Sequence, residues 1–239
     1  IKGVKDANPN MACTAKHFPG DGVEELDQHL ALGVNNLPVE EWETSYGRIY
    51  RTLIDEGLEA VMVGHIALPE MSRKLRPGIK DSEIMPATLA PELLMGLLRE
   101  SMDFNGVIIT DASHMIGMTA MSKRCDAVPG AIIAGCDMFL FANDIEEDIG
   151  FMKAAYDKGL LTEERLSDAL HRVLGLKAHL KLYDEAIRCP EEENLKVIGC
   201  EEHHAFTVQA ADSCITLVKD TRKYLPIDPE KQKRVFLVY

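Results

Sequence analysis

The feature that constrains this chain most is an alternation of short apolar runs, rich in β-branched residues, with longer segments of helical period. Apolar runs of this length are typical of strands covered on both faces, as in parallel α/β proteins. The pattern therefore predicts a parallel α/β fold. The predicted strands are Met11 to His17, Glu59 to His65, Gly106 to Asp111 and Cys136 to Ala142.

Helices are predicted between and after these strands from apolar stripes and end signals. Pro91 occupies the favoured first position of one helix, and Thr162 is placed to cap another. The stripe after Pro91 consists of Leu94, Leu97, Leu98 and Met102, and the stripe after Thr162 of Leu166, Leu170, Val173 and Leu174. The predicted helices are Val39 to Glu56, Pro91 to Met102, Ala127 to Ala134, Ile145 to Lys158 and a long helix from Glu163.

Four strand–helix units are half of a (β/α)8 TIM barrel, which takes about 250 residues when complete. Half a barrel leaves open sheet edges, which natural proteins seldom tolerate. The sequence also has no initiating methionine. We therefore expect residues 1–186 to be the C-terminal portion of a barrel, with the remainder of that barrel missing from this chain.

The composition turns polar and acidic after the long helix, where Pro190 lies. This change predicts a linker over residues 187–202. Residues 203–239 follow this linker as a further segment. Within it, Phe206 to Lys219 is predicted as a helix leading into a strand, and Val235 to Tyr239 as the start of another strand.

Charge and composition exclude several classes of partner. The formal charge of -13 has the wrong sign for binding nucleic acid or anionic lipid. The longest apolar stretch, Ala131 to Ala142, contains Asp137 and is shorter than the roughly 20 residues of a membrane-spanning helix. The cysteines form no C-x-x-C pair, which argues against zinc and a disulfide framework and favours a cytoplasmic location, with secretion as the alternative.

Two polar motifs follow the first predicted strand. Residues 16–22 read Lys-His-Phe-Pro-Gly-Asp-Gly, and loops after barrel strands form active sites. Asp27 and His29 follow, two residues apart, so the carboxylate can orient the imidazole and fix its tautomer. The alternatives are a turn with satisfied polar side chains and a solvated histidine without a role.

Two other predicted strands end in ionisable residues. Asp111 follows a buried strand, where a carboxylate is costly to desolvate unless it binds or reacts, although it could also cap the next helix. His65 ends another strand and could bind a sugar hydroxyl or cap the strand. Surface or packing roles suffice for His171, His179, His203 and His204.

These motifs together resemble those of family 3 glycoside hydrolases of the NagZ type, which are β-N-acetylglucosaminidases (β-N-acetylhexosaminidases). Residues 16–22 with Asp27-x-His29 resemble the family signature K-H-F-P-G-H-G-x4-D-S-H, and residues 106–111 resemble the strand that carries its nucleophile. Residues 210–226 resemble the opening of the second domain of two-domain members, so the resemblance implies that residues 203–239 are the truncated beginning of an α/β sandwich domain. The chain departs from the signature at Asp21 and Gln28.

The resemblance implies a retaining glycosidase of carbohydrate metabolism, as in the recycling of cell-wall peptidoglycan. In this interpretation Asp111 forms a covalent glycosyl intermediate, and His29, held by Asp27, is the acid/base. Lys16, His17 and His65 would bind the sugar, an N-acetylglucosaminide, and no metal or cofactor would be needed.

Other functions stay open at this point. One is a family 3 β-glucosidase, xylosidase or phosphorylase, and another is an inactive sugar-binding fragment. A metal-dependent hydrolase built from His17, Asp21, His65 and Asp111 is less favoured, because the sequence has no H-E-x-x-H or H-x-H spacing.

Overall fold

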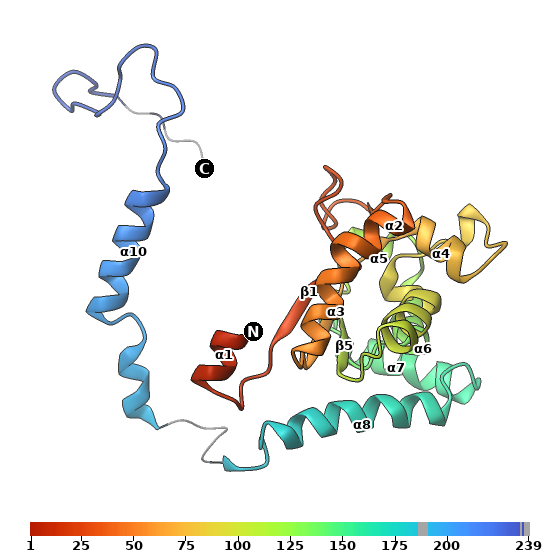
Figure 1. The fold of residues 1–239 in the computed structure, drawn as a ribbon. Coiled ribbons are helices and arrows are strands. Elements are labelled where there is room, and N and C mark those ends of the chain that lie inside the picture. The colour runs from red at the N-terminus through yellow and green to blue at the C-terminus, as the bar shows by residue number, and fades with distance from the viewer. Residues whose placement is uncertain (186–190, 235, 237–239) are drawn as a thin grey trace. The chain divides into compact units, whose positions relative to one another are not determined.

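The structure of the protein is a computed structural model that describes residues 1–185, 191–234 and 236. The chain divides into two compact units, residues 1–185 and 186–239. Figure 1 shows the course of the chain. No helix among the described residues is long and apolar enough to cross a membrane.

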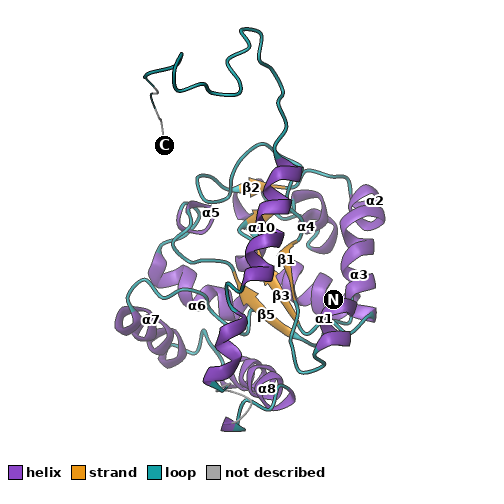
Figure 2. Ribbon diagram, turned by 90° about the vertical axis from the view of Figure 1, so that its left-hand side faces the viewer, coloured by secondary structure: helices purple, strands orange, loops and turns teal. Residues whose placement is uncertain are grey.

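The first unit is built on a parallel sheet whose strand order is β1-β3-β5. The strands are β1 Thr14–Phe18, β3 Ala60–Val63 and β5 Val107–Thr110, which confirms three of the predicted strands with shorter bounds. Neighbours in the sheet follow the order of the sequence, as in a TIM barrel. Figure 2 shows the three strands side by side, with helices of this unit around them.

The predicted fourth strand was wrong. In residues 136–142 the structure has only an isolated bridge between Met138 and Ile109, parallel to β5. The backbone N–H of Leu140 donates to the side-chain Oγ1 of Thr110, at 2.8 Å, instead of to a carbonyl group of β5. Because a side chain takes this ladder position, the segment contacts β5 without forming a regular strand.

Helices lie where the apolar periodicity predicts them. Residues 39–55 form a continuous helix that consists of α2 Val39–Trp42, a π-helical turn η1 Glu43–Gly47 and α3 Arg48–Asp55. The predicted helix after Pro91 is the π-helix η4 Glu92–Ser101, and its apolar stripe is buried as expected. Further along the chain are α6 Arg124–Ala134, α7 Ile145–Asp157 and α8 Glu163–His179.

The predicted cap of the long helix is confirmed, since the Thr162 side chain accepts from the backbone N–H of Arg165. The apolar stripe of α8 is only partly covered, because Leu170 and Leu174 are exposed. Shorter elements complete this unit: α1 Lys2–Ala7, β2 Gly33–Val34, β4 Ile66–Ala67, α4 Pro69–Leu75, η2 Asp81–Glu83, η3 Ala87–Leu89 and α5 Ile116–Thr119.

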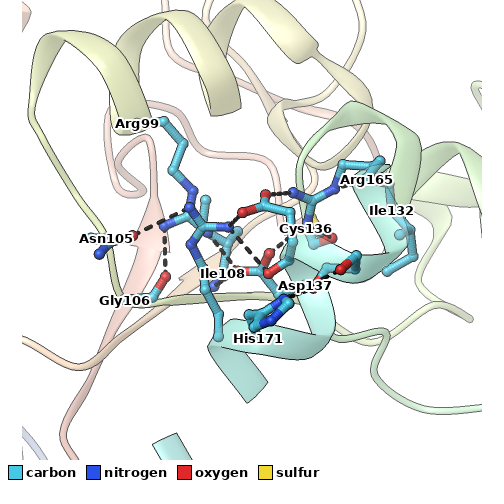
Figure 3. Close-up of polar contacts among 12 residues, drawn as sticks. Arg99, Asn105, Gly106, Ile108, Ile132, Cys136, Asp137, Arg165 and His171 are labelled. Carbon is cyan, nitrogen blue, oxygen red and sulfur yellow. Dashed lines mark hydrogen bonds and ion pairs between the residues drawn. The ribbon is translucent and has the colours of Figure 1, made fainter. Parts of the chain in front are cut away.

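A buried ion-pair network joins β5 to α8 (Figure 3). The fully buried Asp137 carboxylate accepts from Arg99 and Arg165, each at 2.5 Å, and from the backbone N–H of Ile108 at 2.9 Å. Arg99 also donates to the carbonyl oxygens of Phe104 and Gly106. Burial lowers the pKa of Arg99 to about 10, which leaves it charged at neutral pH.

The second unit contains η5 Glu192–Val197 and α10 Glu201–Cys214. The strand expected after this helix does not form. Within the described part of the unit, residues 215–220 are paired with no strand. The strand expected at 235–239 lies outside the described residues except for Phe236. The predicted linker and sandwich domain stay predictions.

Candidate functional site

The C-terminal ends of the three parallel strands meet at one edge of the sheet. The backbone N–H of Gly64 donates to Phe18 O at 2.8 Å, and that of Asp111 donates to Val63 O at 2.9 Å. These bonds continue the pairing just beyond each strand. They bring His17, His65 and Asp111, from three separate strand ends, to the same edge.

His17 faces the predicted nucleophile. The register of β1 against β3 shifts between Ala15 and Phe18, so Lys16 and His17 lie in an irregularity of the strand. Such irregularities re-aim side chains and are common beside active sites. His17 Nε2 lies 3.4 Å from Asp111 Oδ2, while its Nδ1 lies 3.5 Å from Asp21 Oδ2. Lys16 is exposed.

Asp111 is a partly shielded carboxylate with one oxygen tied to its own backbone. Its side chain is 12% exposed. Oδ1 accepts from the N–H of Ala112 at 2.7 Å, and Oδ2 faces His17. The strand end, the adjacent N–H and the imidazole together fix the direction of this carboxylate. Such an oxygen can attack an electrophilic carbon or stabilise a cation.

Burial lowers the pKa of His17, although the Asp111 carboxylate opposes this shift. The imidazole is therefore neutral near pH 7. A neutral ring can donate a hydrogen bond without placing a full positive charge beside Asp111.

The loop after β1 is held through its backbone carbonyl groups. Trp42 Nε1 donates to Pro19 O at 2.8 Å, Asn35 Nδ2 donates to Gly20 O at 3.2 Å, and Tyr46 OH donates to Asp21 O at 2.7 Å. Sequence reasoning did not identify these three supporting residues. A Cβ atom on Gly20 would lie 2.3 Å from the Tyr46 ring, and the φ of Gly20 is +130°. Only glycine fits this position.

Asp27 and His29 form the contact that their spacing predicts. His29 Nδ1 lies 2.6 Å from Asp27 Oδ1, and the same oxygen accepts from the His29 backbone N–H at 2.9 Å. These two hydrogen bonds hold the pKa of Asp27 below its ordinary value, and the bond from the backbone N–H has the larger effect. Both side chains are exposed, at 58% and 68%. The hydrogen bond is confirmed, whereas its catalytic role stays a prediction.

His65 is enclosed beneath the site. Its residue is 0% exposed, Nε2 lies 3.0 Å from Ala112 O, and Nδ1 lies 2.9 Å from Thr88 Oγ1. Burial lowers the pKa of this histidine. Contact with a sugar would require the ring to give up one of these partners, and its sugar-binding role stays a prediction.

Metal-binding geometry is absent from the part of the chain that the structure describes. No group of three or more His, Cys, Asp and Glu side chains there is arranged to hold a metal ion. Instead, His17 lies between the carboxylates of Asp21 and Asp111, and His29 contacts Asp27.

Residues 1–176 match the family described as "Glycosyl hydrolase family 3 N terminal domain". A relative from Cellulomonas fimi, named β-N-acetylglucosaminidase/β-glucosidase, is 47% identical over 229 residues, which are 96% of this chain and 40% of that protein. A β-hexosaminidase from Hydrogenovibrio crunogenus is 32% identical over 183 residues, or 76% of this chain and 46% of that protein. The chain thus spans less than half the length of both relatives.

Solved structures agree with this result. The β-glucoside phosphorylase BglX has a TM-score of 0.81 and 44% identity, over 92% of this chain and 40% of that one. A family 3 β-N-acetylglucosaminidase from Paenibacillus sp. has a TM-score of 0.73 and 26% identity, over 94% of this chain and 41% of that one. From its matched residues and its sheet, this chain belongs to glycoside hydrolase family 3 and carries the α/β fold of that family's N-terminal, TIM-barrel-like domain.

Proposed function

We propose that the full-length protein is a retaining glycosidase that removes terminal β-linked N-acetylglucosamine. The observation that carries this proposal is the 2.6 Å contact between His29 Nδ1 and Asp27 Oδ1 on an exposed turn. Because this contact engages Nδ1, Nε2 is left to exchange a proton with a substrate. The names of the relatives from Cellulomonas fimi and Paenibacillus sp., both of which include N-acetylglucosaminidase, support the same substrate.

The proposed reaction has two steps. Asp111 attacks the anomeric carbon while the bond to the leaving oxygen breaks, and His29 Nε2–H gives its proton to that oxygen. Water then attacks the anomeric carbon, His29 takes a proton from the water, and the bond to Asp111 breaks. Each step inverts the anomeric centre, so the overall configuration is retained. Asp27 holds the ring in one tautomer through both steps.

Binding of the sugar is assigned to the residues at the edge of the sheet. Lys16 and His17 follow the irregularity in β1, and the His17 ring is beside Asp111. They would donate hydrogen bonds to sugar hydroxyls. We retain His65 as the third predicted sugar ligand. From the cysteine spacing we propose a cytoplasmic location.

Phosphorolysis of a glucoside is the second candidate, and a specific observation favours it. The structure with 44% identity and a TM-score of 0.81 is titled a β-glucoside phosphorylase. In that reaction phosphate replaces water and the product is a glycosyl 1-phosphate. An imidazole at the acid/base position carries no negative charge, so it does not repel an incoming phosphate as a carboxylate would.

The test is hydrolysis of 4-nitrophenyl N-acetyl-β-D-glucosaminide by the full-length protein, with and without phosphate. Asp111→Ala and His29→Ala should each lower kcat by at least about 100-fold. The matched control is His171→Ala, which removes an exposed histidine of α8. A full-length protein that cleaves the glucoside but not the N-acetylglucosaminide contradicts the proposal.

Added azide separates the roles of the two residues. In Asp111→Ala, azide attacks the anomeric carbon directly and should give a glycosyl azide of inverted configuration. In His29→Ala, azide displaces Asp111 from the covalent intermediate and should give one of retained configuration. Any other pairing of variant and product rejects the assigned roles.

A further inference from the structure

Gln28 differs sharply in its environment from the two residues on either side of it. Asp27 and His29 have side chains that are 58% and 68% exposed, whereas Gln28 is only 5% exposed. A side-chain amide is seldom enclosed unless its polar atoms are bonded. The burial therefore points to defined partners for both ends of the amide.

Those partners come from two other segments of the site. Gln28 Oε1 accepts from the backbone N–H of His65 at 3.1 Å, and Gln28 Nε2 donates to Asp21 Oδ2 at 3.2 Å. The assignment of the two amide atoms follows from chemistry, because a backbone N–H only donates and a carboxylate only accepts. The amide thus bridges the loop after β1 and the end of β3.

The backbone of the same turn is also fixed. The carbonyl oxygen of Gln28 accepts from the N–H of Gly117 at 3.2 Å. A Cβ atom on Gly117 would lie 2.8 Å from the Cβ of His65 and 3.2 Å from Gln28 O, so only glycine allows this approach. Gly64 also allows a close approach, because a Cβ atom there would lie 3.1 Å from Gln28 Oε1.

Asp21 links this anchor to the nucleophile. Its Oδ2, which accepts from Gln28, also lies 3.5 Å from His17 Nδ1, and His17 Nε2 lies 3.4 Å from Asp111 Oδ2. The two positions at which the chain departs from the family signature therefore contact each other. A continuous set of polar contacts runs from residue 28 to Asp111.

We propose that Gln28 is a positioning residue that fixes the Asp27–His29 turn relative to Asp111 through its bridge between Asp21 and the His65 backbone. This role rests on the proposed function. Gln28 touches no reacting atom in it. It sets the place from which His29 exchanges its proton, and small displacements of such a group lower rates steeply.

In variants of Gln28, the loss of kcat/KM should depend on the leaving group of the substrate. A 2,4-dinitrophenolate leaves with little help from an acid, whereas a methoxide leaving group needs a proton. Displacing His29 should therefore slow cleavage of methyl N-acetyl-β-glucosaminide more than cleavage of the 2,4-dinitrophenyl substrate. Damage to folding or to sugar binding would slow both by the same factor.

The experiment compares kcat/KM for these two substrates in the full-length protein and its variants. Gln28→Met keeps the length of the side chain and removes both hydrogen bonds. Gln28→Glu replaces the amide donor by a carboxylate oxygen, which then faces the Asp21 carboxylate without a hydrogen bond. In the double variant Asp21→Asn with Gln28→Glu, the Asn amide can donate to the new carboxylate. Glu25→Gln, an exposed change in the same loop, is the matched control.

The expected result is that Gln28→Met and Gln28→Glu lower the methyl to dinitrophenyl ratio of kcat/KM by at least about 10-fold. The double variant should recover most of the ratio lost in Gln28→Glu, and Glu25→Gln should leave it unchanged. Equal losses on both substrates, or no loss, overturn the positioning role alone. A wild-type protein that cleaves neither substrate refutes the proposed function itself.

Discussion

Replacement of Asp137 by alanine should cost the first unit much of its stability. The Asp137 side chain is 0% exposed, and its partners Arg99 and Arg165 are 6% and 12% exposed. Asp137→Ala leaves two enclosed guanidinium groups without this carboxylate and the N–H of Ile108 without its acceptor. Removing one member of a buried ion pair costs about 3–5 kcal/mol.

A loss of about 4 kcal/mol is a large part of the roughly 5–15 kcal/mol by which a domain is stable. With a urea m-value of about 2 kcal/mol/M, the unfolding midpoint should fall by about 2 M. Trp42 is the single tryptophan of the chain and is fully buried, so its fluorescence reports unfolding of this unit. The assay is therefore a urea titration of the 239-residue chain followed by fluorescence.

Two variants make this result specific. Asp137→Asn keeps an acceptor but loses the charge, and should fall between the wild type and Asp137→Ala. Asp126→Asn changes an exposed aspartate and should stay within about 0.5 kcal/mol of the wild type. A shift of less than about 0.5 M for Asp137→Ala would refute the reasoning, because it would mean that the two arginines find water or other partners at little cost.

Three further outcomes follow from other contacts. Trp42→Phe removes the donor to Pro19 O and should cost about 1–3 kcal/mol, measured as a lower thermal midpoint together with a lower kcat. Burial lowers the pKa of His65 from its ordinary 6.5, so the folded state binds a proton less readily than the unfolded state. Stability should be full above about pH 6.5 and fall as the pH drops below it, and this fall should be smaller in His65→Gln when thermal midpoints are compared at about pH 7.5 and about pH 5.5. Burial also raises the pKa of the Cys136 thiol, so iodoacetamide should label the exposed Cys125 in the native chain and spare Cys136, as peptide mass spectrometry can show.

The helices and three of the strands could be predicted because their signals are local. An apolar stripe or a buried run reflects the environment of the segment that carries it, as in η4 and β5. The prediction of a strand at residues 136–142 from the same kind of signal was wrong. The pairing of this segment depends on Thr110, whose side chain accepts from the N–H of Leu140, and that contact is visible only in three dimensions.

In the site, too, contacts between residues near in the sequence could be predicted, and contacts between distant residues could not. The hydrogen bond between Asp27 and His29 joins residues two positions apart, so spacing alone predicted it. The supports of the loop after β1 were missed, because Trp42 reaches Pro19 across 23 positions and Tyr46 reaches Asp21 across 25. In the sequence, Gln28 stands out only as a departure from a motif. Nothing in its neighbourhood in the sequence indicates that its amide is enclosed.

The capture of three successive carbonyl groups, at Pro19, Gly20 and Asp21, bears on how this loop can evolve. Every residue type has a backbone carbonyl, so these bonds tolerate exchange of a side chain at residue 21. Mutation can therefore alter the chemistry displayed by the loop while its path stays the same. Selection on substrate preference then acts on side-chain atoms, and selection on folding acts on backbone carbonyl groups. The substrate preference can therefore change while the fold of the loop is kept.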